Sequence, residues 1–438
     1  MPKVHIQNFG CRATQADGTA LETLLATQGF EAAREHAEAN LVILNTCTVT
    51  AAADEDVRSA VRRVHRENPE ARILVTGCYA QRAPEELAAL PGVTWVVGNS
   101  HKTAIPDLIA DEAVFAPGIP YHGGIHVGEV TSFLTAPVEE SSADRTRPNL
   151  KIQDGCSNRC SFCIIPSVRG RSRSLPADEV VGQVARLAPR YREVVLSGIN
   201  LGRWGREQGM NLRLAALLRR LLDETPIERI RLSSVEPMDF TDALLAVMAE
   251  SPRIAKHVHA PLQSGSDAVL RRMRRKYRSR HYEDRVRKAH ELMPDAAIGA
   301  DVMTGFPGET DAEFEENRAF IASLPFTYLH VFTYSERPGT EAAGRPDQVP
   351  MAVRRERTRV LRALGAEKNL AFRRRFVGRS LSVVTLGKPG TALSDNYLSV
   401  ELAVPRPENL LTTVLAGSLT GNGLREASPL PVLGAPSV

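Results

Sequence analysis

The sequence predicts an α/β protein in three parts: an N-terminal open parallel α/β sheet, a central partial (β/α)6 barrel and a small C-terminal β-barrel. Short apolar runs alternate with amphipathic helical patterns as far as Phe332, which is typical of parallel sheets. From Leu150 onward these units become longer and more regular. Beyond a long basic helical segment, the pattern changes to short strands separated by turn residues.

In the N-terminal part, each of three isolated cysteines follows its own predicted strand. The strands are expected at residues 4–6, 41–44, 73–75 and 94–97, with helices at 17–28 and 54–68. Cys11, Cys47 and Cys78 are 36 and 31 residues apart, close to the ~30-residue length of a strand–helix–strand unit. The thiols are therefore expected to meet at the carboxyl edge of the sheet, where ligands bind. The alternative is that they are inert core cysteines.

The central part predicts six strand–helix repeats. The strands are expected at 150–152, 193–196, 230–232, 257–259, 298–302 and 328–332, and the helices at 177–187, 213–222, 241–249, 267–273, 282–292 and 311–324. Chemistry in parallel barrels gathers at the carboxyl ends of the strands. Small or polar residues stand there, although such residues often only form a turn, and Ser234, Glu236 and Gln263 among them suit an amino acid or a ribose. The full set is Ser197, Gly198, Asn200, Ser234, Glu236 and Gln263.

The C-terminal part begins with a basic helix expected over residues 350–376. Strands are expected at 381–385, 397–402 and 410–415, with a turn at 388–390. The residues alone indicate a small β domain, which either contacts a ligand or only caps the structure.

The other three cysteines form one C-x3-C-x2-C run, Cys156, Cys160 and Cys163. Three thiolates at this spacing can hold three irons of a [4Fe-4S] cube and leave the fourth iron open. Disulfides are typical of short secreted chains, whereas this chain has 438 residues and begins without a signal-peptide pattern. Structural zinc is the stronger alternative, but it usually takes four protein ligands, and each group here supplies three.

The charge balance is mildly basic, with 55 Lys and Arg against 51 Asp and Glu. Arginine-rich runs at 169–173, 271–276 and 373–375 can each be a solvated surface, but together they suggest an RNA or DNA partner. No stretch reaches the ~18 apolar residues of a membrane span, so no membrane association is expected.

The C-x3-C-x2-C run, with Phe162 before its last cysteine, resembles the signature of radical S-adenosylmethionine (SAM) enzymes. The surroundings of the upstream cysteines resemble the methylthiotransferases of that superfamily, namely Phe-Gly-Cys11-Arg, Asn-Thr-Cys47-Thr-Val-Thr and Val-Thr-Gly-Cys78-Tyr-Ala-Gln. Arg169-Gly170, Leu-Gln-Ser-Gly-Ser-Asp at 262–267 and Gly-Phe-Pro-Gly-Glu at 305–309 extend the resemblance over nearly the whole chain. The residues around Cys47 and Cys156 are similar to those of the MtaB-type branch of this family.

The resemblance implies two [4Fe-4S] clusters. The one on Cys156, Cys160 and Cys163 would bind SAM and cleave it to a 5′-deoxyadenosyl radical. The one on Cys11, Cys47 and Cys78 would hold the sulfur that is methylated and joined to C2 of an adenine. SAM contacts are expected from Phe162 and from the six residues named above that follow the central strands. An unactivated C–H bond needs this kind of cofactor chemistry.

The MtaB-type branch implies N6-threonylcarbamoyladenosine at tRNA position 37 as the substrate. The alternatives are isopentenyladenosine 37 in tRNA or an aspartate of a ribosomal protein and, from another class, a non-catalytic zinc protein that binds RNA. The resemblance further implies contact with the tRNA anticodon stem-loop, an electron donor such as flavodoxin or ferredoxin, and a cytoplasmic location. The expected domains are a methylthiotransferase domain (1–115), a linker (116–147), a radical SAM core (148–375) and a TRAM-like RNA-binding barrel (376–438).

Two positions depart from the family pattern. Thr14 stands where the family usually has Asn, which leaves the ligands in place but changes the hydrogen bonding expected around the first cluster. Trp204 stands where Tyr is expected, a conservative change.

Overall fold

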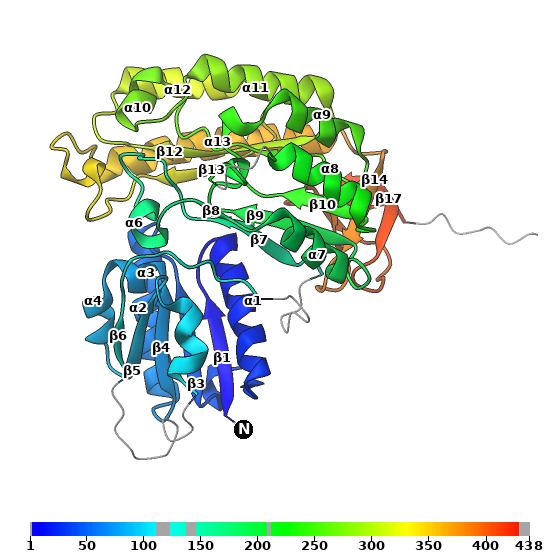
Figure 1. Cartoon of the computed structure of the whole chain (residues 1–438). Helices are drawn as coiled ribbons and strands as arrows, with labels where there is room; N and C mark the ends of the chain where they lie inside the picture. The colour runs from blue at the N-terminus through cyan, green and yellow to red at the C-terminus, as the bar shows by residue number, and fades with distance from the viewer. Residues whose placement is uncertain (1, 111–122, 137–145, 208–211, 429–438) are drawn as a thin grey trace, which may run out of the picture.

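The computed structural model describes residues 2–110, 123–136, 146–207 and 212–428. They form an N-terminal sheet with its helices, a central unit of parallel strands covered by helices, and a small barrel beside the central unit (Figure 1). The predicted α/β class and its three-part order are confirmed.

The N-terminal sheet has six parallel strands in the order β2-β1-β3-β4-β5-β6. The strands are β1 (Lys3–Asn8), β2 (Glu31–Ala32), β3 (Leu41–Thr46), β4 (Arg72–Gly77), β5 (Val93–Gly98) and β6 (Gly124–His126). The helices are α1 (Arg12–Thr27), α2 (Ala51–Glu67), α3 (Cys78–Arg82), α4 (Pro84–Ala88) and α5 (Ile105–Leu108). Every residue of β3 is buried, and its alternate side chains enter two separate apolar cores, one on each face of the sheet.

Two differences from the sequence-based expectation bear on the site. Helix α1 begins at Arg12 instead of residue 17, so Cys11 directly precedes its first turn. Residues 124–126 were expected to belong to the linker, but they form β6 and pair with β5. The rest of that expected linker falls partly outside the described residues.

The central unit contains the six expected parallel strands in two sheets, β10-β9-β7-β8 and β11-β12-β13. Its strands are β7 (Asn149–Asp154), β8 (Arg173–Ser174), β9 (Glu193–Gly198), β10 (Arg229–Leu232), β11 (His257–His259), β12 (Ala297–Thr304) and β13 (Tyr328–Thr333). Its helices are α6 (Ile165–Arg169), α7 (Ala177–Leu187), α8 (Leu214–Glu224), α9 (Asp242–Glu250), α10 (Asp267–Arg272), α11 (Ser279–Leu292) and α12 (Asp311–Ser323). A parallel bridge between Ile230 and Ile254 lies between the two sheets. The short strand β8 was not expected; it pairs antiparallel with β7.

The amphipathic helices explain why these strands are covered on their outer face. Helix α7, for example, buries Val180, Val184 and Leu187, which are spaced four and three residues apart along one side of the helix. These residues join the large apolar core between the strands and the helices.

The C-terminal part consists of the long helix α13 (Met351–Arg374) and a closed five-stranded barrel, β14-β15-β16-β18-β17. The strands are β14 (Ser380–Thr385), β15 (Thr391–Ser394), β16 (Ser399–Glu401), β17 (Leu411–Leu419) and β18 (Leu424–Glu426). The barrel contacts the N-terminal ends of the central strands, where Arg231 donates to the carbonyls of Ser394 (2.9 Å) and Asp395 (3.0 Å). The Tyr397 ring stacks on His257 at 4.3 Å. None of the described helices has the length and apolar character needed to cross a bilayer.

Candidate functional site

The first thiol triad lies at the carboxyl edge of the N-terminal sheet. Cys47 and Cys78 directly follow β3 and β4, and Cys11 lies three residues beyond the end of β1. Because β1, β3 and β4 are neighbours in the sheet, their three loops lie side by side. Cys47 and Cys78 are buried, whereas Cys11 is exposed.

Two glycines allow these loops to approach closely. Gly10 has a φ of +89°, and a Cβ atom there would lie 2.4 Å from Cys47 Cβ and 2.7 Å from its Sγ. Gly77 has a φ of +99°, and its Cβ would lie 2.5 Å from the carbonyl oxygen of Thr46. Both positions therefore require glycine, for conformation and for space.

The thiols of the first triad influence one another electrostatically. Burial, followed by the charges of Cys78 and Cys11, raises the pKa of Cys47 to about 12. Three thiolates this close are unfavourable without a bound cation, whereas a coordinated metal deprotonates such thiols. The donor set is that of a metal centre.

The second triad occupies the loop between β7 and α6. Burial, then Cys160 and Cys156, raises the pKa of Cys163 to about 12. Two side chains donate to its sulfur atoms: Asn200 Nδ2 to Cys156 Sγ at 3.6 Å, and Arg275 Nη1 to Cys160 Sγ at 3.3 Å. Arg275 is also ion-paired with Glu236.

The number of thiols in each triad favours a cluster over structural zinc. Structural zinc usually takes four protein ligands, whereas each triad supplies three thiols and so suits a cluster with one open corner. Among the described residues, one group of three His, Cys, Asp or Glu side chains has ligand atoms all within 4.8 Å of one another: His259, Asp301 and His330.

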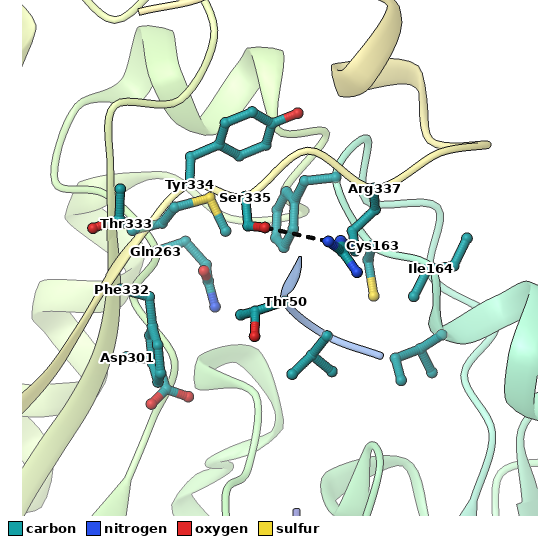
Figure 2. Close-up of a pocket in the computed structure, with 14 residues that line it drawn as sticks. Thr50, Cys163, Ile164, Gln263, Asp301, Phe332, Thr333, Tyr334, Ser335 and Arg337 are labelled. Carbon is teal, nitrogen blue, oxygen red and sulfur yellow. Dashed lines mark hydrogen bonds between the residues drawn. The ribbon is translucent and has the colours of Figure 1, made fainter. Parts of the chain in front are cut away.

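A cavity of about 360 Å³ lies beside Cys163 of the second triad and the loop that follows Cys47 (Figure 2). Its lining includes Cys163 of the second triad as well as Val49 and Thr50, which follow Cys47 in sequence. The rest of the lining comes from the central unit and the segment after β13: Phe162, Ile164, Ile165, Gln263, Asp301, Met303, Phe332, Thr333, Tyr334, Ser335 and Arg337. Of the expected site residues, Cys163, Phe162 and Gln263 belong to this lining, whereas the thiols of the first triad and the residues that follow β9 and β10 do not.

The loop that carries Val49 and Thr50 is held against the central unit by polar contacts. Arg337 donates to Asp54 at 2.7 Å and to the carbonyl of Thr48 at 3.3 Å. The backbone N–H of Ala51 donates to Ser335 Oγ at 3.1 Å. These bonds fix the N-terminal wall of the cavity relative to its barrel wall.

Four of the expected cofactor residues surround the second triad. Asn200 contacts Cys156, and Gly198 packs against Gln153, so that a Cβ at this glycine would lie 2.9 Å from the Gln153 side chain. The Ser197 hydroxyl and the Asn200 side-chain oxygen are buried without a hydrogen-bond partner among the described residues. Glu236 is held by Arg275. Unpaired buried polar atoms of this kind suit a polar ligand.

The other three expected residues lie toward the barrel interior. Gln263 and Phe162 line the cavity, and Gln263 adopts a left-handed φ of +66°. Ser234 Oγ lies 2.7 Å from His259 Nδ1. All seven residues stand at the carboxyl side of the central strands, and their assignment as cofactor contacts stays a prediction.

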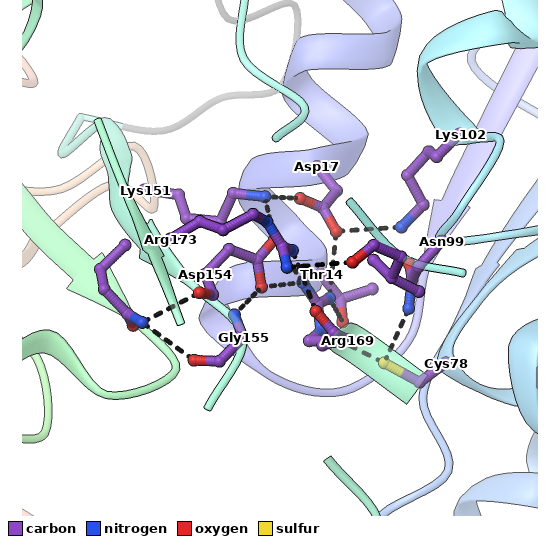
Figure 3. Close-up of polar contacts among 12 residues, drawn as sticks. Thr14, Asp17, Cys78, Asn99, Lys102, Lys151, Asp154, Gly155, Arg169 and Arg173 are labelled. Atoms are coloured by element: carbon purple, nitrogen blue, oxygen red, sulfur yellow. Dashed lines mark hydrogen bonds and ion pairs between the residues drawn. The ribbon is translucent and has the colours of Figure 1, made fainter. Parts of the chain in front are cut away.

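A buried polar network connects the two triads, and the sequence analysis did not anticipate it (Figure 3). Arg169 reaches from the end of α6 to Cys78, with Nε 3.3 Å from Sγ. It also contacts Asp17 of α1 and Asp154 of β7, which in turn bind Lys102 and Lys151. The sequence signal was present in the Arg169-Gly170 motif, but it did not indicate the partners of Arg169.

The interpretation of the arginine runs as phosphate-binding patches is wrong for one residue in each run. Arg169 and Arg275 are buried and donate to cysteine sulfurs. Arg373 is buried and donates to the carbonyls of Thr420 and Gly423.

The structure shows the hydrogen-bond partners of the two residues that depart from the family pattern, Thr14 and Trp204. The hydroxyl of Thr14 lies 3.5 Å from Cys11 Sγ and accepts a long bond (3.4 Å) from Arg169, so a polar atom remains beside the first triad. Trp204 is fully buried in the central core, and its indole N–H donates to the carbonyl of Leu175 at 2.9 Å.

Two family models match this chain. Residues 150–321 match the radical SAM superfamily, and residues 3–98 match the uncharacterized protein family UPF0004. Among solved structures, the radical S-adenosylmethionine methyltransferase TsrM from Kitasatospora setae has a TM-score of 0.57 at 16% identity and covers 78% of this chain and 77% of its own. This likeness concerns the fold.

Curated relatives match along most of the chain. The threonylcarbamoyladenosine tRNA methylthiotransferase MtaB of Bacillus subtilis is 39% identical over 88% of this chain and 85% of its own, and that of Aquifex aeolicus is 36% identical over 91% and 96%. The tRNA-2-methylthio-N(6)-dimethylallyladenosine synthase of Syntrophotalea carbinolica is 33% identical over 88% and 89%. With identities of this size over nearly full lengths, the chain belongs to the radical SAM methylthiotransferase family.

Proposed function

We propose that this protein adds a methylthio group to C2 of N6-threonylcarbamoyladenosine at position 37 of tRNA. The observation that carries the proposal is a cavity lined both by Cys163 of the second triad and by Val49 and Thr50, which follow Cys47 of the first (Figure 2). A target base in this cavity is next to Cys163 on one side and to the loop after Cys47 on the other. The relatives named MtaB, at 33–39% identity, support the choice of nucleoside.

The residues fit two [4Fe-4S] clusters and SAM. Cys156, Cys160 and Cys163 would hold one cluster, and Cys11, Cys47 and Cys78 the other. When bound, the cluster on the second triad supplies the electron that cleaves SAM, and the cluster on the first triad supplies the sulfur site for the methylthio group. Each triad offers three thiols, which leaves one corner of each cluster open for these ligands.

The protein's own side chains would orient these groups and limit access of water. Arg275 and Asn200 donate to sulfurs of the second triad and so would stabilise the negative charge of its thiolates. Apolar side chains, including Val49, Met303 and Phe332, line the space in which the base would lie. SAM would contact the buried polar groups of Ser197, Asn200, Ser234 and Glu236, together with Gly198, Gln263 and Phe162.

The partners follow from this activity. The substrate is the tRNA anticodon stem-loop, and an electron donor such as flavodoxin or ferredoxin would reduce the second triad's cluster in the cytoplasm. We assign residues 1–115 to the methylthiotransferase domain, 148–375 to the radical SAM core and 376–438 to a TRAM-like barrel that contacts RNA.

Nucleoside mass spectrometry of tRNA from a strain lacking this chain tests the function. We expect loss of the methylthio form and accumulation of unmodified N6-threonylcarbamoyladenosine, restored by the wild-type gene but not by Cys160→Ala. Loss of methylthio-isopentenyladenosine, or of methylthio-aspartate in a ribosomal protein, would instead move the substrate to a sister branch. Colourless protein with stoichiometric zinc after anaerobic isolation would favour a non-catalytic RNA-binding protein.

A further inference from the structure

Arg169 follows the cysteines of the second triad in sequence but contacts a cysteine of the first triad in the folded chain. It lies six residues after Cys163, at the end of α6. Its guanidinium, 1% exposed, donates from Nε to the sulfur of Cys78 at 3.3 Å. Asn99 Nδ2 is the other side-chain donor to this sulfur, at a longer 3.5 Å.

The same guanidinium is held on its remaining sides by carboxylates (Figure 3). Nη1 donates to both oxygens of Asp154, at 3.0 and 3.1 Å, and Nη2 donates to Asp17 at 3.0 Å. Asp154 also accepts from the backbone N–H of Gly155 at 2.7 Å, directly before Cys156. One side chain therefore connects the loop of the second triad with a ligand of the first.

The charges in this network do not cancel. Asp17 and Asp154 face three cations, Lys102, Lys151 and Arg169, and all five residues are at most 6% exposed. Two negative and three positive groups leave one positive charge over. An unpaired charge in a buried site is unfavourable by several kcal/mol, so an anion is expected nearby.

The ionisation of these groups agrees with this count. Burial would raise the pKa of Asp17, but Lys102, Lys151 and Arg169 lower it well below its usual range. The pKa of Lys102 is lowered by burial and, among charged groups, by Arg169, as crowding of cations requires.

The second triad has no such excess. Its arginine, Arg275, donates to Cys160 at 3.3 Å but is ion-paired with Glu236, so this contact is electrically balanced. The sulfur that the charged network contacts directly is that of Cys78, through Arg169.

We propose that Arg169 is a positioning residue for the cluster on Cys11, Cys47 and Cys78, whose negative charge it stabilises through Cys78 with the surplus charge of the network. This inference rests on the part of the proposed function that places an iron–sulfur cluster at the first triad. Hydrogen bonds to cluster sulfurs and nearby charge set reduction potentials, so Arg169 makes this cluster easier to reduce.

The test uses the full chain with Cys156, Cys160 and Cys163 all changed to Ala, so that reconstitution fills the first triad alone. Iron content is measured, and the reduction potential is followed by electron paramagnetic resonance during a redox titration. With Arg169 intact we expect about four irons per chain. Absence of iron here would refute the cluster at the first triad, separately from the role of Arg169.

In this background, Arg169→Met is expected to shift the reduction potential downward, because the positive charge and the bond to Cys78 are both lost. Arg169→Lys keeps the positive charge but loses the planar set of guanidinium N–H donors, so the downward shift of the reduction potential is expected to be smaller. Arg173→Met is the matched control, since this arginine lies in the same segment and its bonds go to the carbonyls of Val130, Arg171 and Arg169, not to a cysteine.

An unchanged potential in Arg169→Met, or an equal shift in Arg173→Met, would overturn the proposal. If Arg169→Met yields no folded chain, Arg169→Lys decides: a downward shift supports the role, and a wild-type potential and spectrum contradict it.

Discussion

Phe332 is expected to stack on the target adenine, and Phe332→Ala measures that contact. The side chain lies on β13, lines the cavity and is 47% exposed, so much of its surface is free to contact a base. Stacking of a base on an aromatic ring stabilises binding by about 1–3 kcal/mol. At about 1.36 kcal/mol per tenfold, the loss corresponds to a decrease of roughly 5- to 160-fold in kcat/KM.

The assay is methylthiolation of an anticodon stem-loop that carries threonylcarbamoyladenosine, at several RNA concentrations below saturation. Because Phe332 is assigned to the base and not to SAM, cleavage of SAM without RNA should stay at the wild-type rate. Phe332→Tyr should retain most activity, and Leu292→Ala, a comparably exposed side chain on α11 that is not part of the cavity lining, should have no effect. Wild-type kcat/KM in Phe332→Ala would refute the stacking contact.

Three further predictions concern the clusters and the buried charges. Cys47→Ala should halve the iron bound after reconstitution but spare SAM cleavage, whereas Cys160→Ala should abolish cleavage; intact cleavage in the latter would contradict the roles given to the triads. Asp17→Asn leaves three buried cations with one carboxylate, so urea denaturation of the iron-free chain should show a loss of about 3–5 kcal/mol, and a loss below about 1 kcal/mol would count against the network. Burial would raise the pKa of Glu193, but the charges of Arg231 and neighbouring arginines lower this pKa. The ionised Glu193 therefore stabilises the fold above the unfolded pKa of about 4.3, and this stabilisation is lost as the pH falls through the lower folded pKa. Glu193→Gln should therefore show a flatter decline of melting temperature below about pH 4.3 than the wild type, and parallel curves would argue against this source of acid sensitivity.

The expected strands and the edge of the sheet that carries the thiols could be found from sequence because both depend on local patterns. The run of buried residues in β3 is continuous in sequence, and parallel strands place Cys47 and Cys78 at the same edge. The strands that escaped notice are short: β2, β6, β8, β15 and β18 have two to four residues each. Strands of this length exist because a neighbour pairs with them, and no periodicity marks them in advance.

The cavity was only partly predictable. Gln263 and Phe162 were expected near the ligands because they stand in motifs at strand ends. Phe332 and Arg337 were not, because their importance depends on the docking of the N-terminal loop against the segment after β13. Contacts between parts of the chain that are nearly 300 residues apart leave no trace in local composition.

The arginine runs show the same limit for electrostatics. In each run one guanidinium is buried against an acceptor that only the folded chain supplies: a thiolate and carboxylates for Arg169, a thiolate and Glu236 for Arg275, and two carbonyls for Arg373. Neighbours in the same runs, Arg171, Arg271 and Arg374, are exposed. A phosphate backbone attracts accessible cations, so RNA contact from these runs falls to the exposed arginines, while the buried ones hold the cluster ligands and the barrel in place. Loss of an exposed arginine should thus weaken RNA binding in a salt-dependent way without changing the reduction potential of the cluster on the first triad, the reverse of the effect expected at Arg169.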